Sequence, residues 1–136
     1  ISVMDTVKIV TRSRATISSD MGFLNGIAGQ TISGYEIHMG QTQTTQPMFQ
    51  ITSRENKPAN EPDGYITEDG RIWGTYIHGL FENDGFRKAW LASIDMQSTV
   101  SNFGHERAAA YDRLADVLES SLNISMLDSI ISTGVT

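Results

Sequence analysis

The sequence predicts a single α/β domain in which the strands come first and the helices last. Three observations indicate this fold class. Short runs rich in Val, Ile and Thr recur as far as residue 78, an Asp-Gly pair lies between two such runs, and apolar residues recur at helical spacing after residue 83. A chain of 136 residues is long enough for one compact domain, so we expect residues 1–136 to form one.

Several short strand candidates precede the Asp-Gly pair. They span residues 8–11, 15–17, 31–39 and 48–52. Residues 18–29 are punctuated by Ser and Gly and are expected to form a loop. Residues 53–63 carry Pro58 and Pro62 among polar residues without periodicity, which predicts a surface loop.

The pair Asp69-Gly70 predicts a tight turn between two strands, because both residue types tolerate a positive φ. Side chains alternate between the two faces of a strand. In the strand that follows the turn, this alternation places Trp73 and Ile77 on one face, which we expect to be core. It places His78 on the opposite face, at the end of the strand.

The rest of the chain has helical periodicity. Asn83 or Asp84 is expected to cap a helix that begins near residue 85, with a buried stripe formed by Phe86, Trp90 and Ile94. Two further helices are predicted over residues 105–122 and 125–132. We expect their apolar faces to be buried, with Tyr111, Leu114, Leu118 and Leu122 on the first and Met126, Leu127, Ile130 and Ile131 on the second.

Composition excludes several classes of function. The formal charge of −6 argues against nucleic acid or an anionic membrane as the main partner, because such partners attract clustered positive charge. No run approaches the roughly 20 apolar residues of a membrane helix, and a cytoplasmic location is expected. The chain has no cysteine, which excludes disulfides, thiolate metal sites and a cysteine nucleophile within it.

Two segments place reactive side chains beside glycines, Gly-Tyr-Glu-Ile-His-Met-Gly at 34–40 and Gly-Thr-Tyr-Ile-His-Gly-Leu-Phe at 74–81. Alternation puts Glu36 and His38 on one face of their strand, and His78 at a strand end is suited to general-base chemistry. A purely structural role for each side chain is the alternative.

A metal site is a further alternative. Glu36, His38 and His78 are residue types that suit zinc or iron, but no spacing rule links the two segments, so we assign no metal ligands. His105 is expected to be solvated or to cap a helix.

The two segments, in this order and followed by Asn83-Asp84 and Phe86-Arg87, resemble the C-terminal glutamine amidotransferase domain of cobyric acid synthases. The helix with Tyr-Asp-Arg-Leu-Ala-Asp at 111–116 is also similar to the tail of that family. The resemblance covers roughly residues 31–131. It implies a fragment of a flavodoxin-like α/β domain of the Cys–His type, with a mixed sheet and C-terminal helices.

The resemblance also implies roles for individual residues. His78 corresponds to the catalytic histidine, which activates a cysteine for attack on glutamine, and Tyr35, Glu36 and His38 would line or support the glutamine site. The cysteine belongs to an upstream segment, so we expect this chain to be a truncated, inactive part of the domain. Leu80 stands where many related amidotransferases have the Glu that orients the histidine. Glu36, Glu82 or a backbone carbonyl would have to take that role.

The partners implied by the resemblance lie mostly outside this chain. Glutamine would bind here, whereas ATP, Mg²⁺ and the corrinoid substrate would bind an N-terminal synthetase domain, and no cofactor is expected in this chain. The chain begins at Ile1 without an initiator Met, in keeping with a fragment. An incomplete sheet would expose an apolar face and a strand edge, so we expect a homodimer. The alternative function is a non-catalytic binding or interaction domain that keeps an amidotransferase-like fold.

Overall fold

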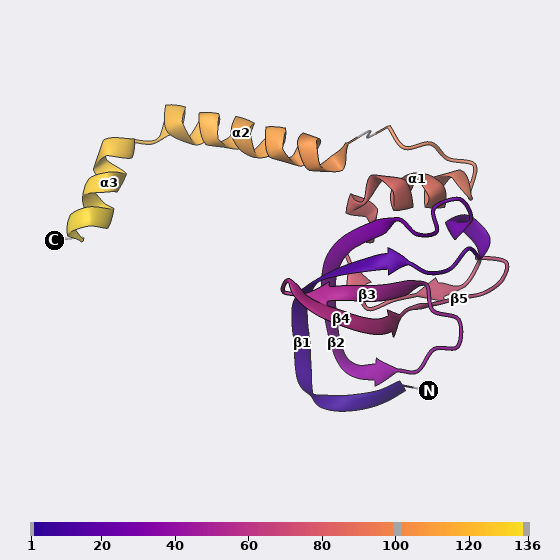
Figure 1. Cartoon of the computed structure of the whole chain (residues 1–136). Helices are drawn as coiled ribbons and strands as arrows, with labels where there is room; N and C mark the ends of the chain where they lie inside the picture. Colours follow the sequence, from indigo (N-terminus) through magenta and orange to yellow (C-terminus); the bar gives the residue numbers. More distant parts are fainter. Residues whose placement is uncertain (1, 100–101, 135–136) are drawn as a thin grey trace. The chain divides into compact units, whose positions relative to one another are not determined.

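A computed structural model describes residues 2–99 and 102–134, and Figure 1 shows the whole chain. The chain divides into two compact units, residues 1–101 and 102–136. The first unit contains all the described strands: β1 (Ser2–Ile17), β2 (Thr31–Thr42), β3 (Phe49–Arg54), β4 (Lys57–Asp63), β5 (Tyr65–Ile66), β6 (Trp73–Gly74) and β7 (Ile77–His78). It also contains two 3-10 turns, η1 (Gly22–Leu24) and η2 (Leu80–Glu82), and the helix α1 (Asp84–Ala92). The second unit contains α2 (Phe103–Ser121) and α3 (Ile124–Thr133).

The main sheet has the strand order β4-β3-β1-β2-β7, and every pairing within it is antiparallel over the described residues. The predicted α/β fold class, a sheet followed by C-terminal helices, is confirmed, but the sheet is antiparallel over the described residues where a mixed sheet was expected. The strand pieces predicted at 8–11 and 15–17 belong to one long strand, β1. This strand pairs with both β2 and β3, and its register with β2 shifts between Met4 and Ile9. Residues 12–14, which separate the two predicted pieces and are polar, therefore continue the strand, because β1 pairs with a neighbour on each side.

The surface loop predicted over residues 53–63 is wrong, because β3 and β4 form a hairpin there. Glu55 and Asn56 form its two-residue turn with φ values of 45° and 62°, the positive values that the tight hairpin turn requires. Pro58 and Pro62 are tolerated because β4 is an edge strand, where a missing N–H need not break a ladder on both sides. This hairpin matters for the site, since it carries Arg54.

The core lies on the inner face of the sheet, under η1 and α1. Its largest fully buried apolar side chains are Ile17, Leu24, Met48, Phe49, Ile51, Ile66 and Phe86. Phe86 is the centre of an aromatic cluster, with ring centroids 5.4 Å from Phe23, 5.9 Å from Trp73 and 5.8 Å from Phe81. The predicted stripe of α1 is thus correct for Phe86 and for Trp90, which packs against the core, but Ile94 lies beyond the end of α1 and is exposed.

Asp69-Gly70 lies in a turn between β5 and β6, which pair through Tyr65↔Gly74 and Ile66↔Trp73, but residues 67–72 separate the two strands, so the connection is longer than the predicted tight hairpin turn. Gly70 has a φ of 71° and donates its N–H to the carbonyl of Thr67. The predicted second strand is interrupted, since β6 ends at Gly74 and β7 begins at Ile77. The face assignment survives this break: Ile77 is buried, Trp73 packs against the core and His78 is exposed.

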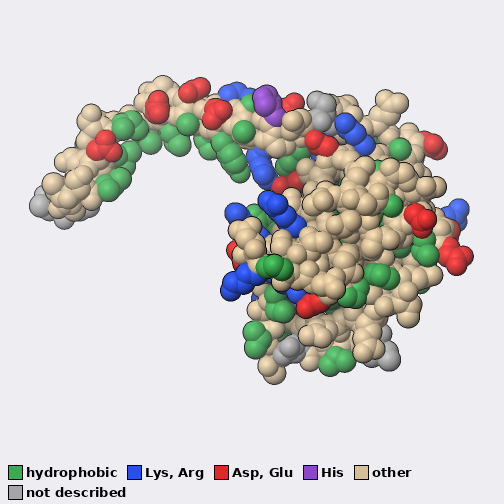
Figure 2. Space-filling model, viewed as in Figure 1, with side chains coloured by type: hydrophobic (Ala, Val, Ile, Leu, Met, Phe, Trp, Pro, Cys, Tyr) green, Lys and Arg blue, Asp and Glu red, His purple; other side chains and the backbone are tan. Residues whose placement is uncertain are grey.

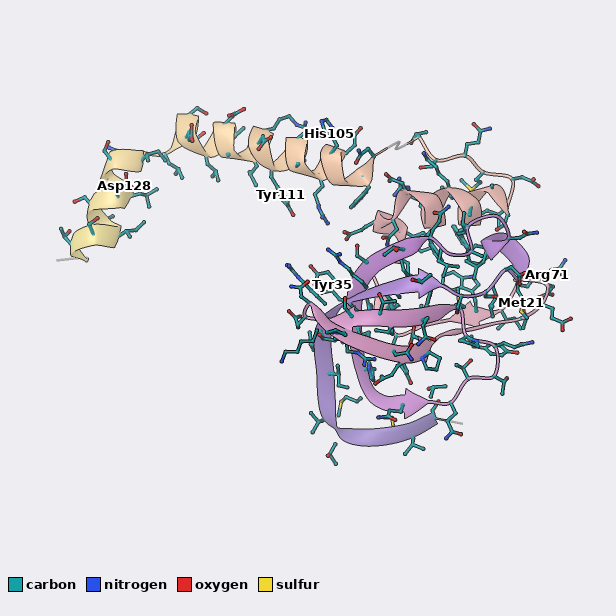
Figure 3. All side chains as sticks on the ribbon, in the orientation of Figure 1. Met21, Tyr35, Arg71, His105, Tyr111 and Asp128 are labelled. Atoms are coloured by element: carbon teal, nitrogen blue, oxygen red, sulfur yellow. The ribbon has the colours of Figure 1, made fainter. Side chains whose placement is uncertain are left out.

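The second unit consists of α2 and α3, each with an Asn cap whose side chain accepts a backbone hydrogen bond. Asn102 accepts from the N–H of His105, which is exposed, and Figure 3 shows His105 and Tyr111 on opposite sides of α2. The apolar side chains predicted to be core are exposed, with Tyr111 at 64% and Leu114 at 54%. Figure 2 shows hydrophobic side chains gathered along one side of these helices. The prediction failed because helical periodicity shows that a face is apolar, whereas burial needs a partner surface.

None of the helices that the structure describes is long and apolar enough to cross a membrane.

Candidate active site

His78 ends the short strand β7 on the outer face of the sheet. β7 pairs with β2 through Tyr35↔His78 and Glu36↔Ile77. Paired residues of antiparallel strands point to the same face, so Tyr35 and His78 share the outer face while Ile77 points into the core. Within the part of the chain that the structure describes, the His78 imidazole has no hydrogen bond or ion pair.

The backbone around His78 is held by close packing against β2. A Cβ added at Gly34 would collide with the carbonyl oxygen of His78 and would lie 2.7 Å from Cγ2 of Ile77. The glycine of the first sequence segment thus allows the second segment to lie against it. After His78, Gly79 takes a φ of 79° and turns the chain into η2.

Asn83 anchors this turn to β2 from the other side. Its Oδ1 accepts from the N–H of Ser33 at 2.9 Å, and its Nδ2 donates to the carbonyls of Ser33 at 2.9 Å and Leu80 at 3.0 Å. The sequence predicted Asn83 or Asp84 as a helix cap. Asn83 occupies the cap position of α1, but its side chain makes no cap hydrogen bond because it bridges η2 and β2 instead.

Glu36 and His38 lie on the inner face of the same strand, as predicted from alternation, and so point away from His78. Glu36 is 2% exposed. Arg54 donates to it twice, from Nε at 2.7 Å and from Nη2 at 2.9 Å, and the Ser13 hydroxyl also donates to it. Burial raises the pKa of the Glu36 carboxyl, but the hydrogen bonds from Arg54 and Ser13 outweigh burial and hold that pKa below its ordinary value.

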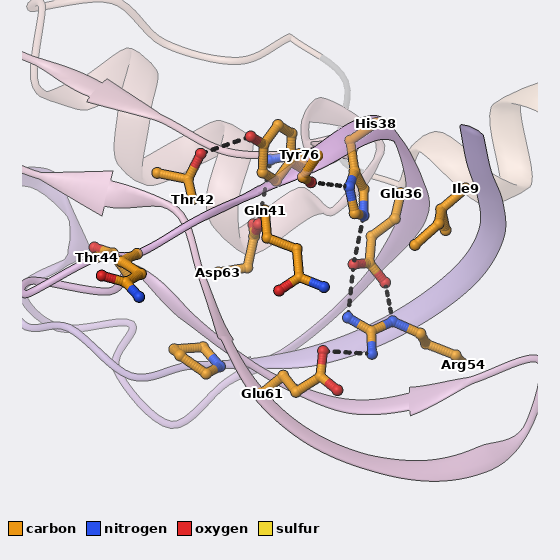
Figure 4. A pocket seen from close by; sticks show the side chains of 13 residues that line it. Ile9, Glu36, His38, Gln41, Thr42, Thr44, Arg54, Glu61, Asp63 and Tyr76 are labelled. Atoms are coloured by element: carbon orange, nitrogen blue, oxygen red, sulfur yellow. Dashed lines mark hydrogen bonds and ion pairs between the residues drawn. The ribbon is translucent and has the colours of Figure 1, made fainter. Parts of the chain in front are cut away.

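Arg54 joins two carboxylates. Besides Glu36 it donates from Nη1 to Glu61 at 2.7 Å. The hydrogen bond with Glu36 is the main reason that the pKa of the Arg54 guanidinium is raised, so Arg54 stays positively charged between the two carboxylates. Figure 4 shows this cluster at the wall of a pocket of about 500 Å³ that is also lined by His38, Asp63 and Tyr76.

Sequence reasoning missed three members of this pocket. Arg54 and Asp63 lie at the start and the end of the stretch that was interpreted as a loop, and Tyr76 lies in the bend before β7. Asp63 is 7% exposed, and burial raises the pKa of its carboxyl despite hydrogen bonds from the Thr75 hydroxyl and the Tyr76 N–H. The sequence signal that could have pointed to this pocket is Asp63, an acidic residue at the end of a stretch that contains Pro58 and Pro62.

The metal alternative fails in the described residues. His78 faces away from Glu36 and His38, and no group of three His, Cys, Asp or Glu side chains in the described ranges is arranged to hold a metal ion. Of the two carboxylates considered as orienters of His78, Glu36 is committed to Arg54 on the opposite face, whereas Glu82 lies in η2, directly after the Gly79 turn.

Comparison with known sequences identifies the family of this site. The sequence model of the CobB/CobQ-like glutamine amidotransferase domain matches residues 1–86, which include both His-containing segments. The chain belongs to this family. The resemblance seen in the two segments is therefore confirmed.

Several curated relatives of the chain are cobyric acid synthases. That of Dehalococcoides mccartyi is 37% identical over 133 residues, which cover 94% of this chain and 26% of the relative. That of Syntrophobacter fumaroxidans is 40% identical over 74% of this chain, and that of Chloroflexus aurantiacus is 41% identical over 75%. The chain spans about a quarter of the length of these relatives. No solved structure matches it.

Proposed function

We propose that this chain supplies the histidine-bearing part of the glutaminase of a cobyric acid synthase, with His78 as its general base. The observation that carries the proposal is the family match over the segment in which His78 stands, at an exposed strand end, with neither ring nitrogen bonded within the described residues. A histidine that is locked into a structural hydrogen-bond network would be a poorer candidate.

In the proposed reaction, a cysteine outside this chain attacks the carboxamide carbon of glutamine. His78 takes the thiol proton, because a free thiol with a pKa of about 8.5 is largely protonated at neutral pH. The proton passes to the leaving nitrogen, so that ammonia departs and a glutamyl thioester remains. His78 then removes a proton from water, which attacks the thioester and releases glutamate and the thiol.

Tyr35 and the inner-face pair have different proposed roles in this site. Tyr35 is 43% exposed and shares the face of His78, with the Arg12 guanidinium 5.7 Å from its ring centroid, so we assign it a contact with glutamine. Glu36 and His38 point to the other face, so they would support the site by holding β2. The strand pairing of β2 and β7 supports this division of roles.

The released ammonia would serve ATP-dependent amidation of corrinoid carboxylates by a synthetase domain. ATP and Mg²⁺ would bind there, and a cytoplasmic location stays a prediction. The chain has no cysteine, so we expect the isolated chain to release no ammonia from glutamine.

The test uses an intact synthase that contains this chain. His78→Ala should lower glutamine-dependent amidation by about 10²- to 10⁴-fold, while amidation driven by added ammonium chloride is unchanged. His105→Ala is the matched control, since that histidine is exposed on α2 in the other unit, and both activities should remain. Loss of both activities in His78→Ala would show a folding role, and full glutamine use would refute the assignment.

A further inference from the structure

The pocket on the inner face has an unmet hydrogen-bonding group at its wall. The His38 side chain is 8% exposed, and its ring stacks on Tyr76 with centroids 4.5 Å apart. Its Nδ1 lies 2.6 Å from the carbonyl oxygen of Gly40. Because a carbonyl can only accept, Nδ1 carries the proton, and in the neutral form of the ring Nε2 then presents a lone pair.

Nothing in the described chain uses that lone pair. Nε2 of His38 is buried without a hydrogen-bond partner, and Oε1 of Glu36, 3.7 Å away, is itself an acceptor. The hydroxyl oxygen of Thr44, on the same pocket, is also buried and unpartnered among the described residues. Two such atoms in one pocket indicate a missing donor, because buried polar groups in folded proteins are nearly always satisfied.

The charge of the lining indicates what kind of donor is missing. Three carboxylates line the pocket, from Glu36, Glu61 and Asp63, against the single guanidinium of Arg54. Arg54 is shared by Glu36 and Glu61, whereas Asp63 accepts from two uncharged donors, the Thr75 hydroxyl and the Tyr76 N–H. The lining therefore favours a cation that brings several N–H groups.

We propose that this pocket binds a small ammonium group, with the ammonium ion as its smallest ligand. The N–H groups would donate to His38 Nε2 and to the Thr44 hydroxyl, and the positive charge would offset the excess of carboxylates. A bare metal ion does not fit the donor set, since no three metal-binding side chains converge in the described ranges. The site is independent of the proposed role of His78, which faces the opposite side of the sheet.

The test is a titration of the whole chain, labelled with ¹⁵N at histidine, with ammonium chloride at constant pH and ionic strength. The His38 ring resonance should shift and saturate with ammonium and with methylammonium, at millimolar concentrations. Potassium and tetramethylammonium should give no saturating shift, because neither ion has an N–H group. The resonances of His78 and His105 serve as internal controls for changes that affect every histidine.

A pair of variants locates the charge that is responsible. Asp63→Asn removes a carboxylate from the pocket and should weaken ammonium binding by at least about fivefold, whereas Glu68→Gln, which removes an exposed carboxylate outside it, should leave the affinity unchanged. A linear shift without saturation, or the same shift with potassium, would show that the pocket holds only water and would overturn the proposal. The titration of the unaltered chain decides this even if Asp63→Asn fails to fold.

Discussion

Replacing Arg54 with Met would leave the Glu36 carboxylate charged and buried without its cation. Glu36 is 2% exposed and loses two hydrogen bonds, at 2.7 and 2.9 Å, so that only the Ser13 hydroxyl still donates to it. Breaking a buried ion pair from one side costs about 3–5 kcal/mol. Since the Arg54 side chain is 28% exposed, solvent weakens the pair, and we expect a loss of about 3 kcal/mol in the free energy of unfolding, the lower end of that range.

The assay is urea unfolding followed by tryptophan fluorescence. Both tryptophans of the chain, Trp73 and Trp90, lie in the first unit and pack against its core, so the signal reports the unit that contains the ion pair. Arg14→Met is the matched control, because that arginine lies on the exposed face of β1, and it should change stability by less than about 0.5 kcal/mol.

A second variant separates the lost pair from the lost side chain. Glu36→Gln combined with Arg54→Met removes the buried charge together with its partner, and it should recover part of the stability that Arg54→Met loses. If Arg54→Met lowered the free energy of unfolding by less than about 1 kcal/mol, the reasoning from burial would be refuted. Equal losses in the single and double variants would refute it as well.

Three further predictions follow from the same geometry. Because the folded pKa of Glu36 is lowered, its contribution to stability is fully present above the unfolded value of 4.5 and is lost as pH falls through the folded pKa. In urea unfolding at several pH values, the unaltered chain should therefore be more stable than Glu36→Gln at neutral pH, and this difference in the free energy of unfolding should shrink below about pH 4.5. Gly34→Ala should cost about 1–3 kcal/mol in urea unfolding, since its methyl group collides with the carbonyl of His78, and an unchanged midpoint would argue against the tight pairing. The outer face of the sheet exposes Val10 at 63% beside its β2 partner Ile37, with Tyr35 on the same face, so sedimentation velocity should show dimers that Val10→Lys reduces. A monomer at high concentration would exclude this interface.

The positions of several elements were predictable from local signals. The Asp-Gly turn, the strand ending at His78 and the helices after residue 83 follow from turn chemistry and periodicity, which act between neighbours in the chain. The β3–β4 hairpin was missed because its turn, Glu55-Asn56, lacks glycine and its second strand contains two prolines. An edge position makes those prolines acceptable, and an edge position is a property of the sheet.

The sequence by itself determined the family and singled out the candidate site residues, because the segments around His38 and His78 are short local patterns. Only the tertiary structure decided that these two histidines face opposite sides of the sheet, since that depends on the register Tyr35↔His78 between strands far apart in the chain. Arg54 reaches Glu36 for the same reason, through pairings that join β3 to β1 and β1 to β2. Alternation within one strand is local, but the side chains that meet across a sheet are set by register, which no single segment contains.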